Sequence, residues 1–412
     1  MAGDFGHQYM TSKTLEILKS FDFQHSEQLV KNYCLDSFHK TENGKKLIAL
    51  PNGDNIFKPL ELRKLHVPNP GAGEDFFENG YIEHVYYVFE YFMKRMISLR
   101  KTQKEVEFAQ AAGVIGHFIQ DASCPPHSIG VQWGVDLEII KLLLPPENKN
   151  NNLLQLHSIL ENYYSEFRFE GYSPKLKGKS PSEAAFNLCA DYTDMIENSL
   201  ALLIPMTQAL YKGQVEIIKQ CLAKSAIPAV KLYADFLYTT FILASAESIP
   251  SEGLNNADLT KAVPYKWSAY AQAPYYCPRI RNSNMSLSSD FSPIPLQLNL
   301  NGEIIHFDKG FGVGTPSYIS YILPEGVYQK FKAIIGIHSE TGASGEVIFQ
   351  VLANDKIIFD SGRITSSKSK QISVPINHCE VLTLRTIPYC KNNLAENNAI
   401  WANPTIKKIV LK

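Results

Sequence analysis

The chain has 412 residues, with 40 basic and 41 acidic side chains and a formal net charge of −1. This length exceeds what one hydrophobic core usually organises, so we expect two domains. The balanced charge argues against an overall field that attracts nucleic acid or an anionic membrane, so an anionic substrate would be held locally.

Between about residue 11 and residue 248, apolar residues recur at helical spacing, which predicts an all-α N-terminal domain. Gly, Pro and Asn interrupt the pattern at Leu50 to Ala72, and Gly and Pro interrupt it at Gly171 to Ser182. The first is a long connection, of the kind that often carries functional residues. No run approaches the roughly 20 apolar residues of a membrane-spanning helix. The predicted helices are Thr14 to Phe23, Gly80 to Arg100, Glu105 to Asp121, Asn150 to Phe167, Ser182 to Tyr211 and Gln214 to Ala246.

The third predicted helix carries a candidate metal site. His117 and Asp121 stand four residues apart, so they lie on one helix face, one turn apart, where both reach the same cation. Pro125 and Pro126 cannot continue the helix, so the chain turns there and brings His127 from a new direction. The pattern is typical of a metal site.

A second pair of the same kind, His157 and Glu161, stands on the next predicted helix. One such pair alone is more often a solvated helix face or a capping pair, but two pairs in one domain favour the metal interpretation. Further candidates precede them: His7 near the N-terminus, and Asp54 and His66 on the long connection.

The order of these residues resembles the zinc-dependent phospholipase C and S1/P1 nuclease superfamily, which has an all-α fold with a trinuclear zinc cluster. The resemblance covers about residues 2 to 248, and its most specific part is the block His-x3-Asp-x5-His with a Pro before the last His. Leu65-His66-Val67-Pro68-Asn69-Pro70 also resembles the family's His-Phe-x-x-Pro segment.

The resemblance implies up to three zinc ions and a ligand set for each. Asp54, His66, His117 and Asp121 would hold one zinc, and His127, His157 and Glu161 a second. Asp121 would bridge to a third, which His7 and the amino group and carbonyl of the first residue also bind.

The first residue departs from the family pattern. Members usually begin with a mature Trp, often as Trp-Gly-x-x-Gly-His, whereas this chain reads Ala2-Gly3-Asp4-Phe5-Gly6-His7. The chelating atoms belong to the backbone, so Ala2 serves as the ligand if Met1 is removed, which a small second residue favours. If Met1 is retained, the third zinc is not expected.

The substrate pocket also departs from the pattern. Family phospholipases enclose a choline head group in a cage with an aromatic residue just after the first Asp and another three residues before the following His. This chain has Asn55 and Arg63 at those places. We therefore expect a broader or different range of head groups, although Arg63 is equally well interpreted as a solvated surface charge.

These residues indicate phosphodiester hydrolysis. Two zinc ions about 3.5 to 4 Å apart, bridged by Asp121 and a hydroxide, polarise a phosphodiester and supply a nucleophile. The resemblance implies that Asp54 is a ligand that also acts as general base. The leading hypothesis is a zinc phospholipase C that acts at a membrane surface and converts glycerophospholipids to diacylglycerol and a phosphorylated head group.

Two alternatives stay open. An S1/P1-type nuclease would use the same metals, but such nucleases are usually single-domain, disulfide-stapled and led by Trp, so nucleic acid is not the expected partner. The other alternative is a non-catalytic protein in which a metal-stabilised helical scaffold carries a module that binds lipid or glycan. The presence of every side-chain ligand argues against that alternative.

After Ser248 the pattern changes to a segment rich in Pro, Ser, Asn and Tyr, and from Gln297 apolar residues alternate with period two. Turns at Asn301-Gly302 and Asn354-Asp355 then indicate an antiparallel β-sandwich. We expect a helical domain at 1–250, a linker with a first irregular strand at 251–280, and the sandwich at 281–412. The predicted strands are Gln297 to Leu300, Tyr318 to Leu323, Tyr328 to Ile337, Gly345 to Leu352, Lys356 to Asp360, Lys370 to Val374, Val381 to Ile387 and Ile406 to Leu411.

From about residue 280 the chain resembles the NPCBM-type module, a carbohydrate-binding-like β-sandwich appended to hydrolases. Members often carry an acidic residue where this chain has His338, so the resemblance implies glycan or protein contact without specifying the ligand. We interpret Trp401 as a core residue rather than a ligand platform. The matching segments are Lys309 to Ser317, Tyr328 to Ile337, Val347 to Val351, Ser361-Gly362 and Ala399 to Pro404.

The N-terminal residues Met1 to His7 include no basic region and no apolar region of a signal peptide. The seven cysteines stand singly, which argues against a disulfide scaffold and against a thiolate zinc site. A lipid-degrading enzyme that acts on a membrane but lacks a classical signal favours a secreted or exported protein, either a signal-less effector made in the cytoplasm or a trimmed secreted enzyme.

Overall fold

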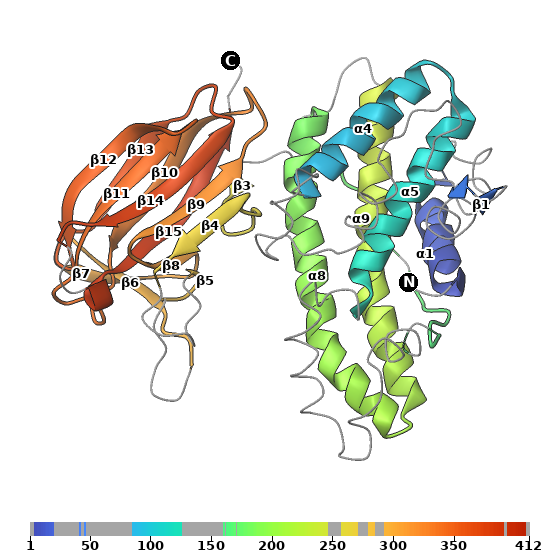
Figure 1. Ribbon diagram of the computed structural model, residues 1–412, viewed down its shortest axis with the longest axis horizontal. Helices are drawn as coiled ribbons and strands as arrows, with labels where there is room; N and C mark the ends of the chain where they lie inside the picture. The colour runs from blue at the N-terminus through green and yellow to red at the C-terminus, as the bar shows by residue number, and fades with distance from the viewer. Residues whose placement is uncertain are drawn as a thin grey trace. The chain divides into compact units, whose positions relative to one another are not determined.

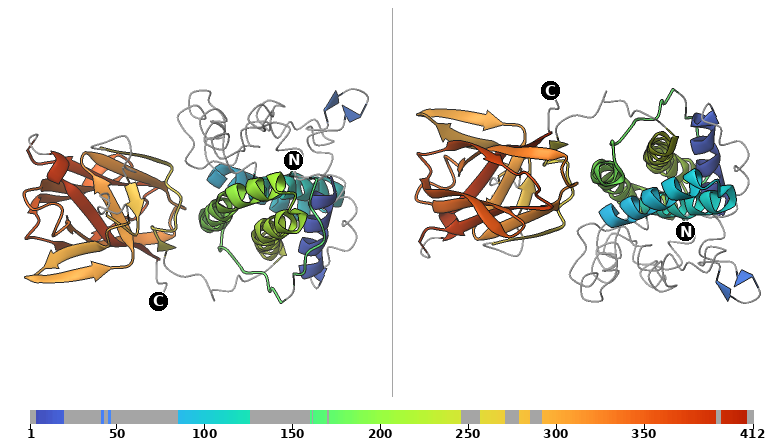
Figure 2. Two further views of the ribbon diagram at one scale, coloured as in Figure 1. Left: turned by 90° about the horizontal axis from the view of Figure 1, so that it is seen from below. Right: turned by 90° about the horizontal axis from the view of Figure 1, so that it is seen from above.

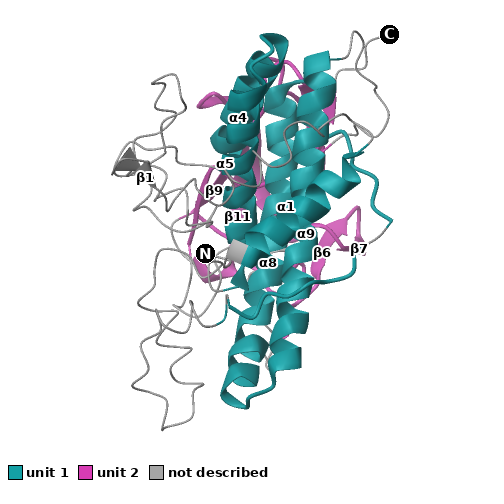
Figure 3. Ribbon diagram, turned by 90° about the vertical axis from the view of Figure 1, so that its right-hand side faces the viewer, with its two compact units in different colours: residues 1–254 teal, residues 255–412 magenta. Residues whose placement is uncertain are grey.

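The computed structural model describes residues 4–19, 41–42, 45–46, 85–125, 160, 162–169, 171–245, 257–270, 279–284, 292–390 and 394–408. The chain divides into two compact units, residues 1–254 and 255–412 (Figure 3). The regular secondary structure described in the first unit is helical apart from one short hairpin of β1 (Thr41–Glu42) and β2 (Lys45–Lys46), and the second unit consists mainly of antiparallel strands. The predicted combination of an all-α domain and an all-β sandwich is confirmed.

The helical unit is organised around α9 (Val215–Ser245). Figure 1 shows α9 between α8 (Pro181–Tyr211) and α5 (Glu105–Ser123). It also packs against α1 (Asp4–Ile17) and α4 (Val85–Lys101), so it contacts every other long helix in the described part of this unit.

The length and apolar composition of α9 would allow it to cross a membrane. However, 67% of its most apolar window is buried inside the protein. A helix that is apolar on most sides is expected at the centre of a bundle. The packing of α9 against four other helices accounts for its composition.

Aromatic side chains join four of the helices. Phe89 of α4 lies edge-on to Tyr192 of α8, with 5.6 Å between ring centroids, and its ring is 5.8 Å from that of Phe236 of α9. Phe118 of α5 stacks on Tyr192 at 5.5 Å. Full burial of such a ring stabilises the fold by about 1.5 to 3 kcal/mol. This cluster therefore holds α5 against its neighbours next to the metal-ligand candidates.

The prediction for the first helix was wrong at its start, because α1 begins at Asp4 rather than Thr14. Its first turns bury His7, Met10 and Thr11. Two of these three side chains are polar, so apolar periodicity does not reveal the buried face. The helix starts early enough to carry His7.

The predicted helix from Asn150 was also wrong at its end, because residues 162–169 form a turn followed by chain without regular secondary structure. This segment packs against α1: Tyr9 donates a hydrogen bond to the carbonyl of Phe167 at 2.9 Å, and their rings meet edge-on at 5.1 Å. Over the described residues, the predicted helices that became α4, α5, α8 and α9 agree with the structure except for small shifts at helix ends.

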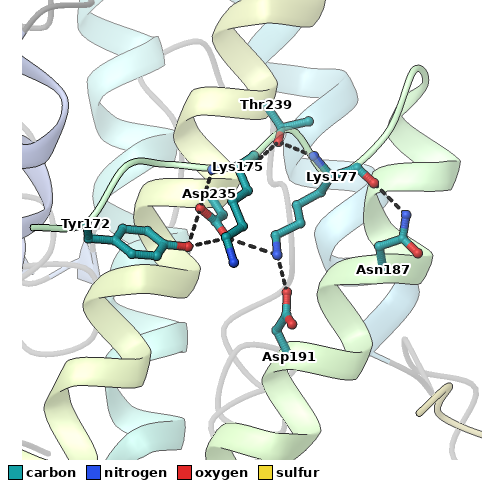
Figure 4. Close-up of polar contacts among 7 residues, drawn as sticks. All are labelled: Tyr172, Lys175, Lys177, Asn187, Asp191, Asp235 and Thr239. Atoms are coloured by element: carbon teal, nitrogen blue, oxygen red, sulfur yellow. Dashed lines mark hydrogen bonds and ion pairs between the residues drawn. The ribbon is translucent and has the colours of Figure 1, made fainter. Parts of the chain in front are cut away.

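Residues 171–180 form an extended strap that leads into α8, and Asp235 of α9 anchors it (Figure 4). The Asp235 carboxylate accepts hydrogen bonds from the Tyr172 hydroxyl at 2.8 Å and from the Lys175 backbone N–H at 2.7 Å. Lys177 Nζ lies 2.9 Å from Asp235 and 2.6 Å from Asp191 of α8. The strap is thereby tied to both long helices.

The second unit contains two facing sheets (Figure 2). Trp401 is fully buried, as predicted, and lies edge-on to Phe349 of the opposite sheet, with 5.1 Å between ring centroids. One sheet has the order β13-β10-β15-β8-β5, with β3 also paired to β15, and the other has the order β12-β11-β14-β9-β4. The strands are β3 (Ala257–Asp258), β4 (Lys266–Ala269), β5 (Arg279–Arg281), β8 (Gly310–Gly314), β9 (Ser317–Ile322), β10 (Tyr328–Ile337), β11 (Glu346–Ala353), β12 (Lys356–Thr365), β13 (Lys370–Pro375), β14 (Val381–Pro388) and β15 (Asn398–Lys408), beside a separate hairpin of β6 (Leu296–Leu300) and β7 (Glu303–Phe307).

Both predicted hairpin turns are present. Asn301 and Gly302 have φ of 56° and 94°, and Asn354 and Asp355 have φ of 48° and 64°. Two successive residues with positive φ are what a tight two-residue hairpin requires, and Asn, Asp and Gly adopt that conformation at the lowest cost.

Several strand predictions needed correction. The last strand begins at Asn398 rather than Ile406, β12 continues to Thr365 rather than Asp360, and β5, β7 and β8 were not predicted. The segment 251–280, where we expected a linker with one irregular strand, contains β3 and β4. All residues of β8 and the first residues of β15 are buried, so they show no period-two alternation. The strands at 257–269 are too short to show a pattern.

His338 follows β10 and has a structural role. Its Nδ1 accepts hydrogen bonds from the backbone N–H groups of Glu340 and Thr341 at 3.2 Å each, and its Nε2 lies 3.1 Å from the carbonyl oxygen of Pro295. Burial lowers the pKa of His338 below its usual value. The neutral imidazole therefore acts as an acceptor at Nδ1 and closes the loop after β10.

Candidate metal centre

Helix α5 presents His117 and Asp121 one turn apart. The distance between His117 Nε2 and Asp121 Oδ2 is 2.9 Å. The helix ends at Ser123, and Cys124 has extended backbone angles, as expected of a residue that precedes Pro125. The predicted helix and its stop before the prolines are confirmed.

A residue from the first helix joins the pair. His7 of α1 places its Nε2 3.1 Å from Asp121 Oδ1. The rings of His7 and His117 stack, with 4.2 Å between centroids and 17° between planes. Each oxygen of the Asp121 carboxylate therefore faces a different histidine.

The group lies in the protein interior, where His7 is 2% exposed and His117 and Asp121 are 1% exposed. Buried carboxylates and imidazoles are costly unless hydrogen bonds, ion pairs or a metal compensate the lost hydration. Tyr192 lies nearby, and its pKa is raised well above its usual value, mainly by burial and further by Cys189 and Asp121. This phenol therefore stays neutral. Three clustered polar residues in such a core are more typical of a functional site than of packing.

Two glycines allow the elements to approach closely. A Cβ at Gly116 would lie 2.6 Å from the ring of Tyr233 on α9, and a Cβ at Gly6 would lie 2.9 Å from the ring of Tyr164. Tyr233 also donates a hydrogen bond to the Ala112 carbonyl at 2.5 Å. The residue before each histidine is thus a glycine packed against a tyrosine ring.

Contacts from neighbouring elements secure the end of α5. Ser199 of α8 donates a hydrogen bond to the carbonyl of Ser123 at 2.5 Å. The last carbonyl groups of a helix lack partners within the helix, so an outside donor stabilises the end. Asp121 therefore sits in a terminal turn that is held by tertiary contacts.

Gln120 also contacts the group, and the sequence pattern did not single it out. Its Oε1 lies 2.8 Å from His7 Nδ1, and its Nε2 donates to Thr11 Oγ1 at 2.8 Å. Gln120 is fully buried. Its position beside Asp121 was the one available signal, but an amide next to a ligand has no spacing that marks it.

The donor types and distances suit a zinc ion. One ligand atom from each of His7, His117 and Asp121 can be chosen so that all lie within 4.8 Å of one another. At usual bond lengths, two ligands of one tetrahedral zinc are separated by about 3.3 Å, and each histidine Nε2 lies at a similar distance from an Asp121 oxygen, 2.9 Å for His117 and 3.1 Å for His7. Imidazole nitrogen and carboxylate oxygen are both good zinc ligands.

The other predicted site residues lie outside the described residues. These are Ala2, Asp54, Asn55, Arg63, His66, His127, His157 and Glu161.

No curated protein matches the chain. Among solved structures, the alpha-toxin from Clostridium absonum is 9% identical, with 98% of this chain and 95% of that chain covered and a TM-score of 0.32. The CBM51 domain of the Clostridium perfringens GH95 protein, solved with methyl-galactose, is 20% identical over 37% of this chain and 99% of that chain, with a TM-score of 0.32.

Part of this chain is also similar to part of a much larger protein. It covers 38% of this chain but only 15% of a Clostridium perfringens ZmpB structure that contains an M60 catalytic domain and two CBM51 domains, at 17% identity and a TM-score of 0.33. Among family models, the NPCBM/NEW2 domain matches residues 269–407, which span most of the β-sandwich. The predicted resemblance of the C-terminal part to an NPCBM module is confirmed.

Proposed function

We propose that the protein is a zinc-dependent phosphodiesterase of the phospholipase C type, which hydrolyses glycerophospholipids to diacylglycerol and a phosphorylated head group. The observation that carries this proposal is the meeting of His7, His117 and Asp121 in one buried group. All three stand where the sequence resemblance expects zinc ligands, and they come from two helices that are far apart in the chain.

The Asp121 carboxylate supports the bridging role that the resemblance implies. Oδ2 lies beside His117 and Oδ1 beside His7. Asp121 would therefore share two zinc ions, one with His117 and one with His7. Asp54, His66, His127, His157, Glu161 and the backbone of Ala2 are the remaining proposed ligands.

Bound zinc supplies a Lewis acid for the phosphate oxygens and lowers the pKa of a water molecule. The chain's own residues prepare the site for this chemistry. The buried carboxylate of Asp121 supplies negative charge for the cations, and the surrounding helices exclude bulk water from its inner side. Asp54 is the proposed general base, with Asn55 and Arg63 at the pocket wall.

The test is to incubate the purified protein with mixed phospholipid vesicles and, separately, with single-stranded DNA and RNA, each with and without a chelator. We expect diacylglycerol release that the chelator abolishes. Nucleotide release without diacylglycerol would support the nuclease alternative instead. Zinc binding with no turnover of either substrate would support the non-catalytic alternative.

We further propose that the β-sandwich contacts glycans at the membrane surface on which the enzyme acts, after export from the producing cell. The match of residues 269–407 to the NPCBM/NEW2 model supports this role, as does the methyl-galactose in the similar CBM51 structure. A glycan array with the full-length protein tests it, and fractionation of a producing culture tests export. Absence of glycan binding, or retention in the cytoplasm, would contradict the corresponding part.

A further inference from the structure

We infer that Gln120 is a positioning residue that selects the tautomer of His7 and aims its Nε2 at the metal. This inference rests on the zinc site of the proposed function. It assigns a role to a residue that is not itself a ligand, and it concerns the ion that His7 would share with Asp121.

Successive residues of α5 contact the two ring nitrogens of His7. Gln120 Oε1 lies 2.8 Å from Nδ1, and Asp121 Oδ1 lies 3.1 Å from Nε2. The ring is thus held from both sides by one helix. One face of the His7 ring also stacks on His117. Turning the ring out of its plane would therefore break the contacts with Gln120, Asp121 and His117.

The Gln120 amide is itself fixed at both ends. Its Nε2 donates a hydrogen bond to Thr11 Oγ1 at 2.8 Å, which keeps its oxygen toward His7. Thr11 and His7 are four residues apart on α1, so one amide spans a turn of that helix. A buried amide without such bonds would destabilise the fold, so this orientation is strongly favoured.

The orientation of the amide decides which nitrogen of His7 can bind a cation. A neutral imidazole has one N–H group and one lone pair. A carbonyl oxygen facing Nδ1 favours the proton there, which leaves the lone pair on Nε2, beside Asp121. Histidines that bind metals commonly donate their other N–H to such an acceptor, which fixes the tautomer and strengthens the ligand.

The decisive experiment measures zinc affinity by competition with a chromophoric chelator, not turnover. Gln120→Met keeps the length of the side chain but removes the acceptor, so we expect the affinity for the zinc that His7 shares with Asp121 to fall by about 10- to 100-fold. Gln120→Glu keeps an acceptor toward Nδ1, and the Thr11 hydroxyl can donate to the new carboxylate. We expect its affinity to stay within a few-fold of wild type.

Gln110→Met is the matched control, because Gln110 is another buried glutamine on α5. It tests whether loss of any buried amide on this helix lowers the affinity, and we expect no change in zinc binding. Unfolding midpoints of the metal-free variants separate general destabilisation from loss of the ligand. Long-range proton–nitrogen NMR of His7 in the zinc-bound protein should show the proton on Nδ1 in the wild type.

Equal weakening by Gln120→Met and Gln120→Glu would show that the residue only fills space, and unchanged affinity in Gln120→Met would also overturn the inference. Both outcomes leave the proposed function intact. A wild-type protein that binds no zinc would instead overturn the proposed function and this inference with it. Zinc binding without phospholipid turnover would contradict the proposed reaction only.

Discussion

His7 approaches Asp121 to 3.1 Å between Nε2 and Oδ1, which joins the first helix of the chain to the helix that carries the central metal-ligand pair. This contact brings residues from opposite ends of a long segment into one buried group with His117. The properties of that group, and of the structure that holds it, lead to five predictions.

Asp121→Asn should abolish phospholipid hydrolysis. The amide has the size of the carboxylate but lacks its charge and cannot bridge two cations. Loss of a neighbour that only supports a zinc ligand costs about 10- to 100-fold, so loss of a bridging ligand should cost more. Diacylglycerol release and zinc content measure the effect, with the exposed Glu216→Gln of α9 as the control. Full zinc content in Asp121→Asn would contradict the ligand assignment.

Removal of zinc should lower the stability of the helical unit. A ligand that binds only the folded state stabilises it by about 2.7 kcal/mol at a concentration 100 times its dissociation constant. Thermal unfolding with excess zinc and with chelator measures the difference. His7→Ala should show a smaller zinc-dependent shift than wild type, because one donor of the buried group is lost. Equal shifts in both proteins would place zinc binding elsewhere.

Gly116→Ala should destabilise the packing of α5 against α9. The new methyl group would lie 2.6 Å from the Tyr233 ring, so the helix or the ring must move. Overpacking of this kind costs about 1 to 3 kcal/mol. Urea unfolding measures the loss, and Glu105→Ala at an exposed position of the same helix is the control. Wild-type stability in Gly116→Ala would mean that the interface is looser than the structure shows.

Asp235→Asn should release the strap of residues 171–180. Asp235 is 2% exposed, and the substitution removes the charge that faces Lys177 and one acceptor for the Tyr172 hydroxyl and the Lys175 N–H. Burial raises the pKa of Asp235 although Lys177 opposes the shift, so removal of the charge itself regains part of the loss.

We therefore expect a net loss of about 1 to 3 kcal/mol for Asp235→Asn and faster proteolysis within the strap. Asp191→Asn is the matched control, since Asp191 contacts the same lysine but its side chain is 44% exposed. Exposed ion pairs contribute only about 0 to 1 kcal/mol. If the two variants lose equal stability, the burial of Asp235 has no special role.

The β-sandwich should lose stability in mild acid because of His338. Burial lowers its folded pKa, with a smaller contribution from His306, against an opposing effect of its hydrogen bond to Pro295 and of Glu340. The unfolded state therefore takes up a proton first as the pH falls. The contribution of neutral His338 is fully present above about pH 6.5 and is lost progressively as the pH falls through the lower folded value.

Urea unfolding of the full-length protein between pH 7.5 and 5, with hydrogen exchange of β10 amides as the local probe, measures this dependence. His338→Asn keeps a polar side chain but does not titrate, so its β10 amides should show a flatter pH profile than wild type. An identical profile in the two proteins would assign the acid sensitivity to other groups.

Local patterns predicted most of the fold. Repeats of 3.6 and two residues identified the helices that became α4, α5, α8 and α9 and most of the long strands, because their buried faces are apolar and their exposed faces polar. The pattern failed where burial is unusual. The buried face of α1 carries polar side chains, and β8 is buried on both faces.

The sequence by itself determined that His117 and Asp121 share one face of a helix that stops before Pro125, because helix periodicity and proline geometry are local properties. The family resemblance implied that His7 joins Asp121, but only the tertiary structure decided the contact itself and the approach of Gln120 to the other ring nitrogen of His7. Those contacts depend on how α1 packs against α5, and no spacing along the chain encodes the packing of two helices that are distant in sequence.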